Sequence, residues 1–329
     1  MNVCVREKQR HCFKSVILAL GLVMFAGQCD AQGWPRTFRN ADGTVTSIPQ
    51  QPRRILSTAV SVTGTLLAIN APVVASATAV NGQFFGQWQD IAKVRKVGKV
   101  WPAGSVDLEQ AWATTPDLIV VSINGADSAL AQLSDLQAIA PVIVVNYSNQ
   151  TWQDLARQLG DALGLEQQAA ASITGFDALI ASTRTRISLP EGKVNIINFN
   201  GPGTVNPVAT PESVHARLLQ SLGFTPESPD PAWQSHLTRS GDFIWVEYEN
   251  LTQLKAETTF LLSASDVRID EFINDPLLQH LPSSRARQVY SLGPHAFRVD
   301  FYSASEMVKA IADRFVVETP SAAATPEVR

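Results

Sequence analysis

Cysteine is nearly absent from this chain of 329 residues, and its three copies, Cys4, Cys12 and Cys29, all lie close to the N-terminus. Beyond them the sequence has no disulfide framework, no thiol nucleophile and no cysteine metal site. Histidine is also scarce, and the four histidines beyond this region never fall at a metal-ligand spacing such as H-x-x-x-H. They are His215, His236, His280 and His295. The sequence therefore predicts no metal held by protein side chains alone.

Catalytic signatures are missing as well. The chain has no G-x-S-x-G elbow, no G-x-x-x-x-G-K-[ST] phosphate loop and no G-x-G-x-x-G that opens a helix. The stretch Gly201-Pro-Gly203 is too short for a phosphate loop and carries a proline where backbone donors are needed. The aspartates are scattered, with no paired-carboxylate motif. We therefore expect a binding protein and not an enzyme.

The N-terminus has the layout of a secretory signal. Four basic residues between positions 6 and 14 precede an apolar run, Val16–Phe25, that is too short to span a bilayer. Small residues at Cys29 and Ala31 suit signal peptidase, so we expect residues 1–31 to be removed. Gln28 stands where a lipoprotein signal needs a small residue before its cysteine, which disfavours a lipid anchor.

The mature chain would be mildly acidic. It keeps 22 basic and 28 acidic residues, a net charge of −6, which disfavours nucleic acid as a partner. No second apolar stretch is long enough to cross a membrane, so we expect no direct membrane insertion. An exported α/β chain without disulfides suits the bacterial periplasm.

The organising stretch of the chain is 165–189, which contains no proline and one glycine. Its apolar residues recur close to a helical spacing, and Pro190 with Gly192 follow it. About 20 helical residues reach roughly 30 Å, the width of a small domain. The stretch alone fits equally a strut between two lobes and a crossover helix within one large sheet.

Short apolar strands alternate with helices on both sides of this stretch, a pattern typical of parallel sheets covered on both faces. Asp42-Gly43 adds a hairpin signal between β-prone runs. Because the pattern restarts after the long helix, the strut is favoured. The predicted fold is α/β, with two lobes of central, mainly parallel β-sheets flanked by helices and joined by one long backbone helix. The predicted segments are a signal peptide (1–31), an N-terminal lobe (32–164), the linking helix (165–189), a C-terminal lobe (190–317) and a disordered tail (318–329).

Several motifs, in a shared order from Trp34 to Phe315, resemble those of periplasmic substrate-binding proteins of ABC importers for iron-siderophores. The most similar are the ferric-enterobactin-binding members. The matching segments are Trp34-Pro-Arg36, Pro52-Arg-Arg-Ile-Leu-Ser-Thr58, Thr63-Gly-Thr-Leu-Leu-Ala-Ile69, Pro116-Asp-Leu-Ile119, Gly125-Ala-Asp-Ser-Ala-Leu130, Thr210-Pro-Glu-Ser213, Asp275-Pro-Leu-Leu-Gln-His-Leu-Pro282 and Phe297-Arg-Val-Asp-Phe-Tyr-Ser-Ala304.

The resemblance implies a class III periplasmic binding protein that captures a ferric catecholate siderophore between its lobes. It implies delivery to an inner-membrane ABC permease with its ATPase, and iron present only as the siderophore chelate, with no cofactor of the protein's own. We expect a monomer and, since one helix spans both lobes, only a small hinge movement. The same fold binding a hydroxamate siderophore, cobalamin or haem is the alternative. An exported siderophore esterase and an interaction-only module are less favoured.

Two glutamates match the positions with which this family docks to arginines of the permease. Glu109 lies in Val106-Asp-Leu-Glu-Gln110, and Glu212 lies in Thr-Pro-Glu-Ser. Each stands near a predicted helix start, where the helix dipole favours an anion. From position alone the role of ordinary first-turn capping glutamates is favoured for both, and only the resemblance assigns them to docking.

A cleft for a flat, trianionic catecholate complex should combine cationic and aromatic side chains. Arg298 is the best single candidate for an anchor, because its motif matches the enterobactin-binding members. The other candidates lie in loops after predicted strands or near the mouth of the second lobe. They are Phe84, Phe85, Trp88, Asn124, Trp245 and Tyr248. For each aromatic residue, core packing is the competing interpretation.

The chain departs from the enterobactin-binding members at two ligand positions. Those members have an arginine where this chain has Asn81-Gly-Gln83, and a tryptophan where it has Ala209. This chain therefore lacks one charge and one stacking surface, and this departure raises the expectation that its ligand is a different catecholate. The residues that could compensate are Lys93, Arg95, Arg239 and Trp245.

Overall fold

The computed structural model describes residues 33–148, 150–235 and 241–317. The predicted signal peptide and tail lie outside these residues, as does Arg239. From Pro35 onward the chain forms one compact unit, which contains two five-stranded sheets and a separate hairpin. The hairpin pairs β1 (Arg36–Arg39) with β2 (Val45–Ile48) around the predicted turn.

The sheet of the first lobe has the order β5-β4-β3-β6-β7, and every neighbouring pair is parallel. Its strands are β3 (Ile55–Ser57), β4 (Val73–Thr78), β5 (Gly98–Pro102), β6 (Leu118–Ser122) and β7 (Val142–Val145). Its helices are α1 (Val60–Ala68), α2 (Gln89–Val94), α3 (Leu108–Ala113), α4 (Leu133–Gln137) and α5 (Trp152–Leu163). Strands β6 and β7 are buried throughout, which explains their unbroken apolar sequences.

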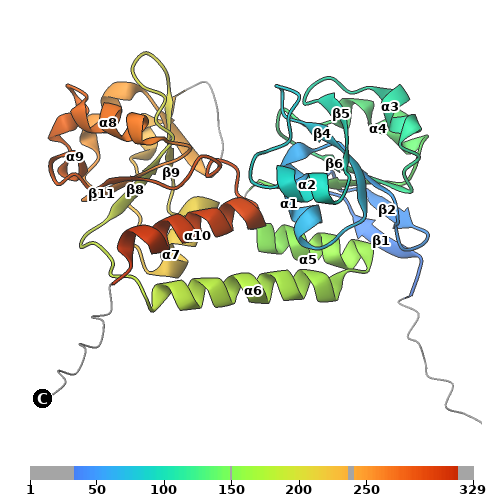
Figure 1. Cartoon of the computed structure of the whole chain (residues 1–329). Helices are drawn as coiled ribbons and strands as arrows, with labels where there is room; N and C mark the ends of the chain where they lie inside the picture. Colours follow the sequence, from blue (N-terminus) through green and yellow to red (C-terminus); the bar gives the residue numbers. More distant parts are fainter. Residues whose placement is uncertain (1–32, 149, 236–240, 318–329) are drawn as a thin grey trace, which may run out of the picture. The chain divides into compact units, whose positions relative to one another are not determined.

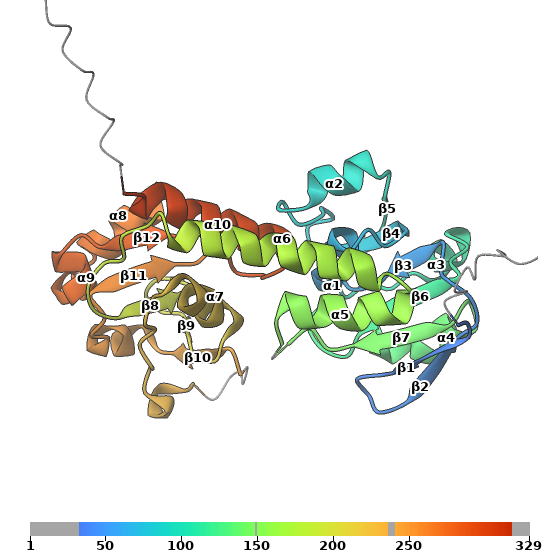
Figure 2. The ribbon, with the colours of Figure 1, turned by 90° about the horizontal axis from the view of Figure 1, so that it is seen from below.

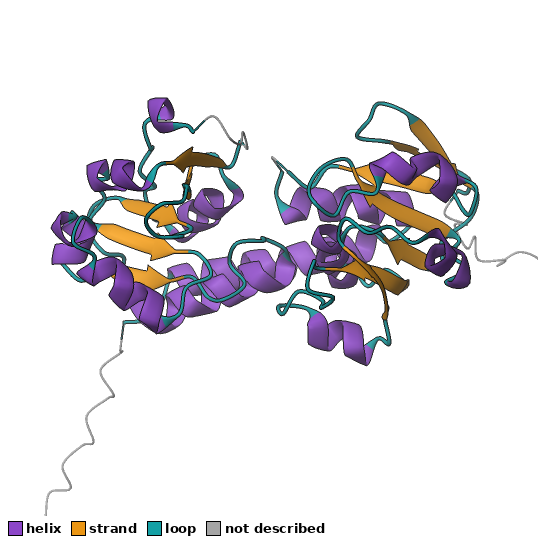
Figure 3. Cartoon of the chain, turned by 90° about the horizontal axis from the view of Figure 1, so that it is seen from above, coloured by secondary structure: helices purple, strands orange, loops and turns teal. Residues whose placement is uncertain are grey.

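The sheet of the second lobe has the order β10-β9-β8-β11-β12. Its strands are β8 (Val194–Ile197), β9 (Asn206–Ala209), β10 (Phe243–Val246), β11 (Thr258–Leu261) and β12 (Val289–Ser291). Strands β8, β11 and β12 are parallel, whereas β9 is antiparallel to both of its neighbours. Its α-helices are α7 (Val214–Leu222), α8 (Asp266–Asn274), α9 (Pro282–Arg285) and α10 (Phe301–Phe315). The expected mainly parallel sheets are confirmed, with this antiparallel edge as a departure (Figure 3).

The predicted long helix is α6 (Glu166–Arg184), 19 residues. It ends before the predicted limit at residue 189, because Thr185 is its C-cap and Ile187 then pairs with Val316 in an isolated bridge. Helix α6 contacts α5 in the first lobe and α7 in the second (Figure 1). The strut is therefore confirmed over the crossover helix.

A second helix accompanies this strut. Helix α10 contacts both α6 and α1, so it also reaches from one lobe to the other (Figure 2). Three aromatic rings fill the junction, with Phe176 of α6 and Phe301 of α10 lying 5.2 Å and 5.3 Å from Trp152 of α5. This packing stiffens the connection between the lobes.

Candidate ligand-binding cleft

A cavity of about 500 Å³ lies between the two lobes. From the first lobe its lining includes the carboxyl ends of strands β6 and β7 and the start of helix α1, the edge where parallel sheets place ligands. From the second lobe it includes β10 and the segment 297–300. Four predicted residues line it: Phe85, Asn124, Trp245 and Arg298.

Arg298 presents an exposed guanidinium to this cavity. Its Cζ lies 5.3 Å from the ring centre of Phe297 and 5.9 Å from that of Tyr147. Within the described residues, no carboxylate forms an ion pair with it. The backbone here is fixed, since Ser303 Oγ donates a 2.6 Å hydrogen bond to the Arg298 carbonyl. The cation is thus positioned and left available for an anion.

Tyr147 forms the opposing wall, and sequence reasoning missed it. Its hydroxyl donates a 3.3 Å hydrogen bond to Asp127, whose other oxygen accepts one from the Ser61 backbone at 2.8 Å. Burial and the Asp127 charge raise the pKa of Tyr147, and Arg298 partly offsets the rise. Tyr147 follows β7 almost directly, so the strand-end signal that identified Asn124 would also have found it.

The second lobe contributes an aromatic wall. Phe297 and Phe243 stack with ring centres 5.7 Å apart, and His215 packs behind Phe243 at 5.3 Å. His215 Nε2 donates a 2.8 Å hydrogen bond to the Ala296 carbonyl. Burial lowers the pKa of His215 to about 4, so the ring is neutral at pH 7. Trp245 adds an indole whose Nε1 has no hydrogen-bond partner among the described residues.

Asn124 shapes the rim of the cavity. Its amide donates to Ser148 Oγ at 2.7 Å and to the side-chain oxygen of Asn146 at 3.2 Å. Ser122 Oγ in turn donates to the Asn124 carbonyl at 2.7 Å. Because its donors are already engaged with the loop after β7, Asn124 holds that loop in place beside the ligand space.

Three aromatic candidates lie outside the cavity lining and pack in the protein core. Trp88 is fully buried behind the cleft wall, and Phe84, 9% exposed, packs on it at 4.9 Å. Tyr248 is 5% exposed and belongs to the core of the second lobe. Burial and a hydrogen bond with Asp275 raise the pKa of Tyr248. These three side chains do not line the cavity, since a strand-end loop also folds residues inward over its own sheet.

The two predicted docking glutamates lie outside the cavity lining. Glu109 is exposed on α3, and Glu212 is exposed just before α7, whose N-cap is Ser213. In the part of the chain that the structure describes, neither carboxylate forms an ion pair. Both are therefore available to an external cation.

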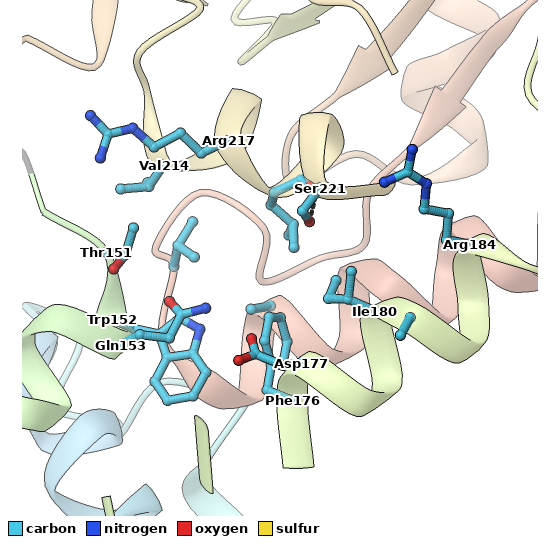
Figure 4. A pocket seen from close by; sticks show the side chains of 14 residues that line it. Thr151, Trp152, Gln153, Phe176, Asp177, Ile180, Arg184, Val214, Arg217 and Ser221 are labelled. Atoms are coloured by element: carbon cyan, nitrogen blue, oxygen red, sulfur yellow. Dashed lines mark hydrogen bonds between the residues drawn. The ribbon is translucent and has the colours of Figure 1, made fainter. Parts of the chain in front are cut away.

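A smaller cavity of about 360 Å³ adjoins the cleft between α5, α6 and α7 (Figure 4). It shares part of its lining with the cleft, including Trp152, Val214 and Val299. Arg217 of α7 and Arg184 of α6 approach it from opposite sides in Figure 4.

Within residues 33–148, 150–235 and 241–317, no group of three or more histidine, cysteine, aspartate or glutamate side chains is arranged to hold a metal ion. In the same segments, no helix combines the length and apolar character needed to cross a bilayer.

Residues 55–296 match the model of the family described as periplasmic binding protein. The chain belongs to this family.

Among its relatives, the ferric enterobactin-binding periplasmic protein FepB of Escherichia coli is 38% identical over 308 residues, covering 90% of this chain and 96% of FepB. The crystal structure of holo-ViuP superposes with a TM-score of 0.84 at 55% identity, covering 87% of this chain and 97% of that chain. The catecholate-siderophore binding protein VctP of Vibrio cholerae shares the fold, with a TM-score of 0.59 at 16% identity over 85% of this chain and 98% of its own.

Proposed function

We propose that this protein captures a ferric catecholate siderophore in the interlobe cleft and delivers it to an inner-membrane ABC permease. The observation that carries the proposal is the guanidinium of Arg298, which has no ion-pair partner among the described residues and lies in an aromatic-lined cavity that both lobes complete. The identity to a ferric enterobactin-binding protein over nearly the whole chain supports the same ligand class.

The chemistry of the cleft suits this ligand. A ferric tris-catecholate carries about three negative charges on flat rings, which suit a guanidinium and stacking surfaces. Arg298 supplies the charge, while Tyr147, Phe297 and Trp245 supply rings. The iron arrives already chelated, so the ligand can be recognised through its charge and its rings.

The proposal extends to location and traffic. An N-terminal signal peptide would export the chain to the periplasm, where it would act as a monomer. Glu109 and Glu212 would dock it on arginines of the permease, and ATP hydrolysis would take place in the transporter and not in this chain.

The protein would carry out no chemistry on its ligand. A serine esterase needs a histidine base hydrogen-bonded to its serine. The cleft histidine, His215, is buried, and its Nδ1, the nitrogen not engaged with the Ala296 carbonyl, has no hydrogen-bond partner among the described residues. We expect mass spectrometry to recover the chelate intact after long incubation with the protein. Hydrolysis that a single serine substitution abolishes would overturn this part of the proposal.

Intrinsic fluorescence quenching tests the ligand, because Trp245 lines the cavity. The titrants are ferric enterobactin, a monomeric ferric catecholate, a ferric hydroxamate and haem. Saturable quenching by a catecholate below about 1 μM, equivalent to roughly −8 kcal/mol, is the expected result. Quenching by the hydroxamate or haem alone would keep the fold and overturn the ligand class.

Arg298→Ala tests the anchor. Removing the cation should weaken catecholate binding at least tenfold, on the order of 1.4 kcal/mol or more. Arg285→Ala is the matched control, because Arg285 is also exposed but does not line the cleft. Equal affinities for the two variants would move the anion site away from Arg298.

A further inference from the structure

Trp112 is the only aromatic residue among the large hydrophobic side chains that the described residues expose, and it is 56% exposed. It lies on α3, which Ala111 and Leu108 fix to the core of the first lobe. Because these two residues anchor the helix, the indole is held outward. Tryptophan is enriched at the energetic centres of protein interfaces.

Glu109 lies three residues before Trp112 on the same helix. Side chains at this spacing share one helix face, with Cβ atoms about 5–6 Å apart. Glu109 is exposed and forms no ion pair within the part of the chain that the structure describes. Asp107, the neighbouring acid, is already engaged as the N-cap and by the Gln110 amide at 2.7 Å. The free carboxylate and the free indole therefore form a pair.

Arginine is the protein side chain that suits both groups best. A guanidinium can donate two parallel hydrogen bonds to a carboxylate while its flat face rests on an aromatic ring. Lysine offers a point charge with no plane to stack. A purely apolar partner would cover the indole but leave the Glu109 carboxylate desolvated beside it, which is unfavourable.

We propose that Glu109 and Trp112 together form an arginine-binding pair, in which the carboxylate pairs with one arginine of the permease and the indole stacks on that arginine. The inference rests on the proposed function for its partner, and it adds a second recognition group that the docking glutamates alone do not provide. Trp112 then discriminates arginine from lysine on the partner surface.

The test measures docking of the chelate-loaded protein to the host's permease–ATPase complex in lipid nanodiscs. Trp112→Ala should weaken docking on the order of tenfold, as a desolvated cation–π contact would. Trp112→Tyr should keep much of the affinity, whereas Trp112→Leu, which retains apolar area without a ring, should not. Val94→Ala is the control, because Val94 is 78% exposed on a different helix, α2.

A double-mutant cycle shows whether the two groups share one arginine. Glu109→Gln and Trp112→Ala combined should weaken docking by less than the product of the single losses, because both act on the same guanidinium. All variants must bind ferric enterobactin like the wild type, which shows that the cleft is intact.

Three outcomes would overturn the inference. Full docking by Trp112→Leu would mean a simple apolar contact, and independent effects of the two substitutions would mean two partners. If Glu109→Gln or Glu212→Gln weakens docking but Trp112→Ala does not, Trp112 plays no part in docking, and the proposed function still stands. A wild type that binds the chelate but never docks would defeat delivery itself.

Discussion

The side-chain amide of Gln87 donates a 3.2 Å hydrogen bond to the carboxylate of Asp300. Gln87 belongs to the loop after β4 in the first lobe, and Asp300 is the N-cap of α10, so the bond joins the lobe to the second bridging helix. Gly64 of α1 makes room for this contact, since a Cβ there would lie 2.3 Å from Asp300 Oδ2. A buried, titratable group therefore sits at the base of the cleft.

Asp300→Asn should make the protein less sensitive to pH. Asp300 is 3% exposed, and burial raises its pKa from 3.8 to about 6. Because the folded pKa exceeds the unfolded one, this group favours folding below pH 4 and loses that contribution as the pH rises to 6. The charged form then costs up to about 3 kcal/mol at pH 7.5. Asparagine keeps the cap without the charge. The variant should therefore be stabilised relative to the wild type by more at pH 7.5 than at pH 4.5, as measured by urea unfolding.

Asp107→Asn is the matched control, because Asp107 also caps a helix, α3, but is only half-buried. There the backbone and side-chain hydrogen bonds of Gln110 lower the pKa, so the carboxylate favours folding at neutral pH. Replacing Asp107 by asparagine should therefore destabilise the protein relative to the wild type by more at pH 7.5 than at low pH. Identical pH profiles for the two variants would show that Asp300 titrates like an exposed acid.

His215 should give the opposite dependence. Burial lowers its pKa from 6.5 to about 4. Because the folded pKa lies below the unfolded one, its contribution to folding is lost as the pH falls from 6.5 toward 4. At pH 5 the loss is on the order of 2 kcal/mol. His215→Gln should therefore lose less stability than the wild type between pH 7 and pH 5. An unchanged difference across this range would show that the native ring accepts a proton freely.

The sequence was sufficient for the elements with a strong pattern. The strut appeared because 19 helical residues without proline stand between two runs of alternating strands and helices. Strand β9 escaped prediction because Asn206 and Pro207 are poor strand formers, and it forms only by pairing with β8 and β10. Strand β5 likewise contains Gly98 and Pro102 and depends on β4.

Part of the site could be predicted because some signals depend only on position along the chain. Asn124 and Phe85 were proposed from their places after strands, and Arg298 was proposed from a motif. Whether a ring faces the ligand or the core depends on packing across 200 residues. Trp88 is buried partly against Asp300, whose Oδ2 and the Trp88 ring both approach Gly64. No local pattern contains that information.

Gly125→Ala should damage both folding and binding. Gly125 has φ +88°, and an added Cβ would lie 1.9 Å from the Tyr147 hydroxyl. The backbone strain alone costs about 1 kcal/mol, and the clash must push the Tyr147 ring out of the cleft wall. Catecholate affinity should therefore fall together with thermal stability.

Gly201→Ala separates the two causes. Gly201 has φ +92°, but an added Cβ would meet no atom within 4 Å. The Gly201→Ala variant should lose stability through backbone strain but keep the wild-type affinity for catecholate. If both alanine variants bound catecholate like the wild type, Tyr147 would not need its present position for binding.

Phe85→Ala and Trp88→Ala should have opposite effects, although their rings lie only 6.3 Å apart. Trp88 is fully buried and does not line the cavity, so its loss should lower the free energy of unfolding by about 3–5 kcal/mol and leave affinity nearly unchanged. Phe85 lines the cavity and is only half-buried, so its loss should weaken catecholate binding several-fold with a smaller effect on stability. Urea unfolding and fluorescence titration on both variants provide the comparison. A Trp88→Ala protein that stays folded but binds more weakly than Phe85→Ala would contradict the assignment of Trp88 to the core alone.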